Sequence, residues 1–189
     1  ANEMAVRIAR AATGHHELVG VSKGYYGCTH EMLSLSDYVG FIKGLGTRAA
    51  GLHRFPAPDC LHCPLGLTHP DCSLRCVSMG EDALEKESTG AIAAILVEPV
   101  MGSGGIVVPP DEFFTRIRAL ADKYGAMLIA DEAQTGLGRT GKWWGMEHSA
   151  VVPDIIVASK GLGNGFPVAA VITTEKIEQK CLQAPLANM

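Results

Sequence analysis

Apolar runs of strand length recur along the chain and are separated by segments with the spacing of amphipathic helices. The sequence predicts strands in five runs, at 18–21, 91–100, 126–130, 154–158 and 168–173. The run AIAAILVEPV at 91–100 is almost continuously apolar, which is typical of a strand covered on both faces. Because strands and helices alternate, we expect an α/β fold with a mostly parallel sheet between helical layers.

Three segments have a helical pattern. Residues 2–13 place five apolar side chains on one face, namely Met4, Ala5, Ile8, Ala9 and Ala12. Gly14 is expected to end this helix. Residues 111–125 predict an amphipathic helix with acidic residues in its first turn and a glycine at its end. Residues 81–88 predict a short polar helix, and the Cys- and Pro-rich stretch 56–78 is expected to be an irregular loop.

The composition is that of one ordinary globular domain. Of 189 residues, 47% are hydrophobic and 19% are charged, which is not the composition of a disordered chain. The formal net charge of −4 gives no electrostatic case for binding nucleic acid or an anionic membrane. No apolar run approaches the roughly 18 residues that span a bilayer, and no signal peptide is visible. We expect a cytoplasmic protein, with the mitochondrion as the alternative, and no nucleic-acid or membrane partner.

Two chemically active residues stand 29 positions apart, each at the end of an apolar run. Asp131 ends AMLIAD and Lys160 ends DIIVASK, and a Gly-rich loop follows each of them. In an open α/β sheet, ligands bind at the carboxyl ends of the strands, so the carboxylate and the amine should face one crevice. This pair suits pyridoxal phosphate (PLP): the amine forms a Schiff base with the aldehyde, and the carboxylate keeps the pyridine nitrogen protonated. The alternative is a pair of solvated residues at strand ends.

The sequence around both residues resembles a known enzyme family. The blocks IADEAQTGLGRTG and PDIIVASKGLGNGFPVAAV are similar to the two signatures of class III, fold-type I PLP-dependent aminotransferases. The nearest motifs are those of the dialkylglycine decarboxylase and alanine–glyoxylate aminotransferase branches. The resemblance runs from Ala1 to about Leu182. It implies that residues 1–189 are the central part of a PLP-binding large domain, incomplete as a fold, from an enzyme that works as a homodimer or higher homo-oligomer.

The resemblance assigns roles to three residues that follow the predicted strands. Lys160 would carry PLP and, once a substrate amine displaces it, act as the base at the substrate Cα. Asp131 would bind the protonated pyridine nitrogen. Gln134 would reach the side of the cofactor that carries the phenolic oxygen, although a plain loop hydrogen bond is its alternative role.

Four further positions are assigned through the same resemblance. Tyr25-Tyr26-Gly27 aligns with an aromatic-His-Gly pattern whose aromatic residue stacks on the pyridine ring, so Tyr25 and Gly27 are expected at the cofactor. An ordinary buried aromatic is the alternative for Tyr25. Tyr26 departs from the usual His and is expected near the substrate. Glu98, at the end of the 91–100 run, is also expected near the substrate, where a buried carboxylate must meet an Arg or a backbone amide.

The predicted reaction moves an amino group from an amino acid or amine to a keto acid or aldehyde. A decarboxylating transaminase and a PLP-dependent lyase remain open, because both use the same Lys and Asp. A protein without catalytic activity, built around the cysteines of the 56–78 loop, is the alternative from a different class.

The loop at 56–78 contains a cluster of cysteines, Cys60, Cys63, Cys72 and Cys76, with the spacing C-x2-C-x8-C-x3-C. Four thiolates can hold a structural zinc ion. Free thiols and disulfides are the alternatives, and disulfides fit an intracellular enzyme less well.

Overall fold

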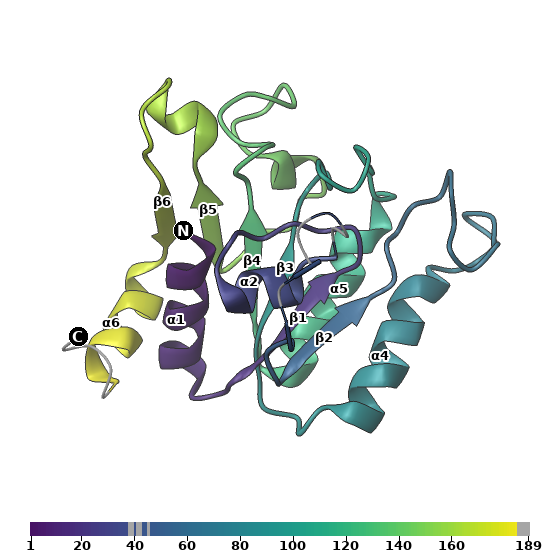
Figure 1. Ribbon diagram of the computed structural model, residues 1–189, viewed down its shortest axis with the longest axis horizontal. Helices are drawn as coiled ribbons and strands as arrows, with labels where there is room; N and C mark the ends of the chain where they lie inside the picture. Colours follow the sequence, from purple (N-terminus) through teal and green to yellow (C-terminus); the bar gives the residue numbers. More distant parts are fainter. Residues whose placement is uncertain (38–39, 41–42, 45, 185–189) are drawn as a thin grey trace.

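Six strands form one sheet in the computed structural model, which describes residues 1–37, 40, 43–44 and 46–184. They are β1 (Glu17–Val21), β2 (Leu52–Phe55), β3 (Ile92–Val97), β4 (Met127–Asp131), β5 (Ile155–Ala158) and β6 (Ala170–Thr173). Their order across the sheet is β2-β1-β3-β4-β5-β6 (Figure 1). Neighbouring strands are parallel, except that β6 runs antiparallel to β5. The prediction of a mostly parallel sheet is confirmed.

Helices cover both faces of the sheet, so the fold has three layers (Figure 1). The helices α1 (Asn2–Thr13) and α2 (His30–Leu35) pack on one face. The helices α4 (Arg75–Glu87) and α5 (Glu112–Tyr124) pack on the other. The last helix, α6 (Glu175–Gln183), lies against α1. In the described part of the chain, no helix is both long enough and apolar enough to cross a membrane.

Strand β3 lies in the middle of this arrangement. All six of its residues are buried, as its continuous apolar sequence predicts. Its side chains contribute to both core clusters, one shared with α4 and α5 and one shared with α1 and α2. The small residues Ala93 and Ala94 belong to the same core cluster as Ala5 and Ala9 of α1. Alanine on both elements allows the helix and the sheet to approach closely, which keeps the start of α1 near the strand ends.

The buried face of α1 differs from the predicted one. Asn2, Ala5, Val6 and Ala9 are buried, whereas Met4 is 50% exposed. The apolar pattern identified Ala5 and Ala9 correctly, but the prediction for Met4 is wrong. The physical reason is that a polar residue, Asn2, takes part in the buried stripe because its amide has partners at the end of the sheet. Gly14 ends the helix in the left-handed conformation, with φ 72°, as predicted.

The helix predicted at 81–88 is longer and begins earlier. It starts at Arg75, within the stretch expected to be irregular, and ends at Glu87. Its buried residues are Val77, Gly80 and Leu84, a narrow stripe on an otherwise polar helix, which is why the sequence shows so little of it. Strand β2 was not predicted, because LHRF is short and half polar. Its Phe55 packs on α4 at Gly80.

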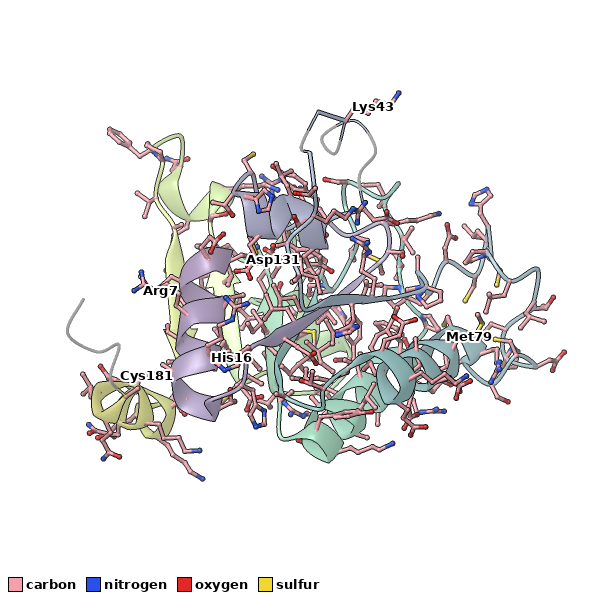
Figure 2. All side chains as sticks on the ribbon, turned by 60° about the horizontal axis from the view of Figure 1, so that its bottom comes forward. Arg7, His16, Lys43, Met79, Asp131 and Cys181 are labelled. Carbon is pink, nitrogen blue, oxygen red and sulfur yellow. The ribbon has the colours of Figure 1, made fainter. Side chains whose placement is uncertain are left out.

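The contact between Gly80 and Phe55 gives a prediction about stability. A Cβ added at Gly80 would lie 1.5 Å from Phe55 Cδ1, and an aromatic ring in a packed core has no room to withdraw. Gly80→Ala should therefore lower the free energy of unfolding by roughly 2–3 kcal/mol, although Gly→Ala in a helix ordinarily stabilises it. The measurement is denaturant unfolding. Met79→Ala, on the same helix (Figure 2), is the control and should change stability little. A Gly80→Ala protein as stable as the parent would contradict this packing.

Candidate active site

A cavity opens at the carboxyl ends of the parallel strands. Its volume is about 260 Å³, and its walls come mainly from the ends of β1, β3, β4 and β5 and the segments that follow them, together with the start of α1. All seven residues predicted from the sequence for the PLP site line it, namely Tyr25, Tyr26, Gly27, Glu98, Asp131, Gln134 and Lys160. The structure therefore brings together residues that lie up to 135 positions apart in the sequence, which span Tyr25 to Lys160.

Asp131 is the last residue of β4 and is 5% exposed. Figure 2 shows it beside the start of α1. Its Oδ2 accepts a hydrogen bond of 2.6 Å from Asn2 Nδ2, and its Oδ1 accepts one of 3.0 Å from the Ala133 amide. Burial raises the pKa of the Asp131 carboxyl, and these two hydrogen bonds and the charge of Lys160 oppose that rise. The site thus contains a desolvated carboxylate whose charge would be stabilised by a cationic N–H group.

Asn2 belongs to the site although the sequence reading did not select it. Its Nδ2 donates to Asp131 and also to the Tyr26 carbonyl oxygen at 2.7 Å. Its Oδ1 is buried and has no hydrogen-bond partner among the residues that the structure describes. The available signal was a polar residue on the helical stripe that also contains Ala5 and Ala9.

Lys160 follows β5 at the start of the 3-10 turn η2 (Lys160–Gly163). Its Nζ donates to Gln134 Oε1 at 2.8 Å, so two of the residues predicted for the cofactor are in direct contact. Its backbone has φ 49°, in the left-handed region that costs a residue with a side chain about 1–2 kcal/mol. Among the residues that the structure describes, Lys160 is the lysine that lines the cavity.

Glu98, directly after β3, connects two loops at the wall of the cavity. Its Oε1 accepts from the Tyr25 amide at 2.8 Å, and its Oε2 accepts from the Gly102 amide at 3.1 Å. The expectation that this carboxylate meets an Arg or backbone amides is met by the amides. Burial raises the pKa of Glu98 from 4.5 to about 7; the two amides oppose this, and the negative charge of Asp131 adds to it.

The two tyrosines have different environments. Tyr26 is buried, and its hydroxyl accepts from the Val21 amide at 2.9 Å and donates to the Leu96 carbonyl at 3.2 Å. That hydroxyl is therefore engaged by the core, and the Tyr26 carbonyl is the atom that contacts Asn2. The Tyr25 hydroxyl lies 2.9 Å from Cys28 Sγ. This contact, together with burial, raises the pKa of Tyr25 to about 12, so the phenol stays protonated at neutral pH.

The four clustered cysteines line a different, smaller cavity, which is bounded also by His69 and Arg75. All four are free thiols, so the disulfide alternative is wrong. Within the described residues, no three His, Cys, Asp or Glu side chains are arranged to hold a metal ion, and the zinc prediction is without support. The loop that contains the cysteines is joined to the segment after β1 by an ion pair in which Asp59 Oδ2 lies 2.5 Å from Lys23 Nζ.

The arrangement fits PLP by its chemistry. An amine that can link to an aldehyde, a buried carboxylate that would pair with a protonated ring nitrogen, and an amide oxygen and an aromatic residue beside them share one cavity. Asp131 carries the strongest part of this fit, because a carboxylate with a burial-raised pKa would be stabilised by a cationic partner.

Comparison with known proteins gives consistent matches over almost the whole chain. The family model for class-III aminotransferases matches residues 1–187. The leucine/methionine racemase of Thermococcus litoralis is 39% identical over 178 residues, which cover 94% of this chain and 40% of that protein. The 4-aminobutyrate aminotransferase GabT of Escherichia coli is 40% identical over 173 residues, covering 89% of this chain and 38% of the relative.

Solved structures of transaminases are similar to this chain in fold as well as in sequence. An (S)-enantioselective omega-transaminase from Thermomicrobium roseum superposes with a TM-score of 0.89 at 34% identity, covering 97% of this chain and 43% of the other. An amine transaminase from an uncultivated Pseudomonas species, in its PLP-bound form, gives a TM-score of 0.91 at 29% identity, with 98% and 44% covered. The chain spans about 40% of the length of the curated relatives it matches.

The environment of Glu98 predicts a pH dependence of stability. Because the folded-state pKa of about 7 lies above the ordinary value of 4.5, the folded protein binds more protons than the unfolded chain between these values. Stability from this group is therefore present below pH 4.5 and is lost as the pH rises to about 7. Glu98→Gln removes the titration. The difference in free energy of unfolding between variant and parent should move in the variant's favour by on the order of 2–3 kcal/mol over this window.

The measurement is denaturant unfolding of both proteins at several pH values from 4 to 8. The other titrating groups are present in both proteins, so the difference between the two curves reports on Glu98. A difference that stays constant across the window would show that the carboxyl titrates normally.

Proposed function

The chain belongs to the class III aminotransferases, and from this premise we propose that the whole protein is a PLP-dependent transaminase. It transfers an amino group from an amino acid or amine donor to a keto acid or aldehyde acceptor. The observation that carries the proposal is the presence of Lys160 and Asp131 in one cavity at the carboxyl ends of β4 and β5. PLP supplies an aldehyde that an amine can attack and a protonated ring that accepts electrons from the substrate carbon.

The residues of this chain have separate tasks in this proposal. Lys160 would hold the cofactor covalently through Nζ, and its amine, once a substrate amine has displaced it, would take the proton from the substrate Cα. Asp131 would accept a hydrogen bond from the ring nitrogen and keep that nitrogen protonated. Gln134, whose Oε1 accepts from Lys160 Nζ at 2.8 Å, orients the lysine and would contact the cofactor near its phenolic oxygen. Tyr25 would pack against the ring and help to exclude water from the site.

We propose in addition that residues 1–189 form the central part of the PLP-binding large domain and that the whole protein is a homodimer or a higher homo-oligomer. Three apolar side chains in the segment after Lys160 support a subunit contact there, because they are exposed in the single chain: Leu162, Phe166 and Val168. Such a contact would lie directly beside the cavity.

A second candidate function is racemisation of an amino acid. The observation in its favour is the 39% identity to a leucine/methionine racemase over 94% of this chain. A racemase needs the same removal of the Cα proton and returns a proton to the opposite face, so Lys160 and Asp131 would serve both reactions. An assay of one amino acid separates them. Loss of optical activity without keto-acid formation indicates a racemase, whereas keto-acid formation that depends on an amino acceptor indicates a transaminase. Decarboxylating transaminases and lyases would instead release carbon dioxide or an eliminated group.

The first test concerns the covalent link. In the full-length protein, Lys160→Ala should abolish turnover and the attachment of PLP that borohydride makes permanent, because Lys160 is the lysine that lines the cavity among the residues the structure describes. Peptide mapping of the reduced protein locates the label. Lys176→Ala, an exposed lysine on α6, is the matched control and should keep both properties. A label found on another lysine in the parent protein would overturn the assignment.

The second test concerns the charge of Asp131. Asp131→Asn keeps the shape of the side chain but removes the carboxylate that would hold the ring nitrogen protonated. The covalent link to Lys160 should still form, while the turnover number should fall on the order of a hundredfold or more. Single-turnover kinetics with the linked protein measures this loss separately from cofactor binding. Unchanged turnover would mean that the ring nitrogen is paired elsewhere.

A further inference from the structure

The side-chain amide of Asn2 connects two parts of the site that are remote in sequence. It donates to Asp131 Oδ2, 129 positions away, at 2.6 Å, and to the Tyr26 carbonyl, 24 positions away, at 2.7 Å. Asn2 is 7% exposed and lies in the first turn of α1. Both hydrogens of its NH2 group are therefore used within the protein, and both of the bonds are shielded from water.

The two hydrogen bonds that Asn2 donates hold different parts of the site. With Oδ1 held by the Ala133 amide and Oδ2 by Asn2, the Asp131 carboxylate cannot rotate about its last bond without losing a buried hydrogen bond. The bond to Tyr26 joins that carboxylate to the Tyr25–Gly27 segment, which the Tyr25 amide also connects to Glu98. One amide thus holds an oxygen of Asp131 and links it directly to the aromatic segment.

Resting on the proposed function, we propose that Asn2 is a positioning residue for PLP: it holds the Asp131 carboxylate ionised and aimed at the ring nitrogen, in register with the stacking Tyr25. An amide is required at this position, because it is neutral and supplies two donors. An aspartate has the same shape but would supply none and would add a second negative charge beside Asp131. The absence of any partner for Asn2 Oδ1 among the described residues agrees with a role carried by the donors alone.

The experiment uses the full-length protein with Asn2→Leu and Asn2→Asp. The dissociation constant for PLP, measured by equilibrium dialysis, should rise about tenfold or more in Asn2→Leu, as expected for a lost buried hydrogen bond to a charged group, and further in Asn2→Asp. The midpoint of the pH dependence of the visible absorbance of bound PLP should shift in both variants. Met4→Ala, an exposed position in the same turn of the helix, is the control and should leave both quantities unchanged.

The outcomes separate this inference from the function on which it rests. If the parent protein forms no PLP link at Lys160, the proposed function fails. If the parent forms the link but Asn2→Leu binds PLP with the same affinity and the same pH midpoint, the inference about Asn2 is overturned. Circular dichroism establishes that the variants are folded. Should Asn2→Leu not fold, the isosteric Asn2→Asp takes its place in the same measurements, and unchanged values there overturn the inference equally.

Discussion

The burial of one carboxylate, that of Asp131, is the constraint on which the rest of the site depends. A charged group at the end of a covered strand is costly unless hydrogen bonds satisfy it. Here the donors are the Ala133 amide in the following loop and the Asn2 side chain on α1. The second donor comes from α1, which packs on the sheet with Ala5 and Ala9 in the same core cluster as Ala93 and Ala94 of β3. The contact between helix and sheet therefore also supplies the second hydrogen-bond donor that the Asp131 carboxylate needs.

The parallel sheet gives the other residues their places. In a parallel sheet the carboxyl ends of the strands lie at the same edge, so the residue that follows each strand already lies near the cavity. Glu98 after β3 and Lys160 after β5 lie on either side of Asp131 at the end of β4. Glu98 also binds the segment after β1 through the Tyr25 amide, so that four neighbouring strands form one wall. Two buried carboxylates and one amine thus share the wall of one cavity.

The sequence predicted the features that a local pattern determines, but not those that depend on contacts between distant segments. The runs around Asp131 and Lys160 predicted their place because strand ends in an α/β fold converge by rule. Asn2 was missed because its partners are 24 and 129 positions away, and its first turn looks like any helix start. The sequence did not predict strand β2 and the first turns of α4. Each of them buries only one or two residues, such as Phe55 of β2 and Gly80 of α4, which pack on each other. The four cysteines suggested a metal from spacing alone, whereas their side chains among the described residues do not form a metal-binding group.

The bond between Asn2 and Asp131 has a consequence for the order of folding. Within this chain α1 is synthesised before β4, so the helix can gain its partner at β4 only after 129 more positions have been added. Contacts of such long sequence separation form late, because the loop that they close is costly in entropy. A chain that has collapsed locally, with β3 to β5 paired, would still present Asp131 without its side-chain donor. Competence to receive a cofactor is therefore a property of the completed topology, and a cofactor that binds only this state stabilises it by mass action.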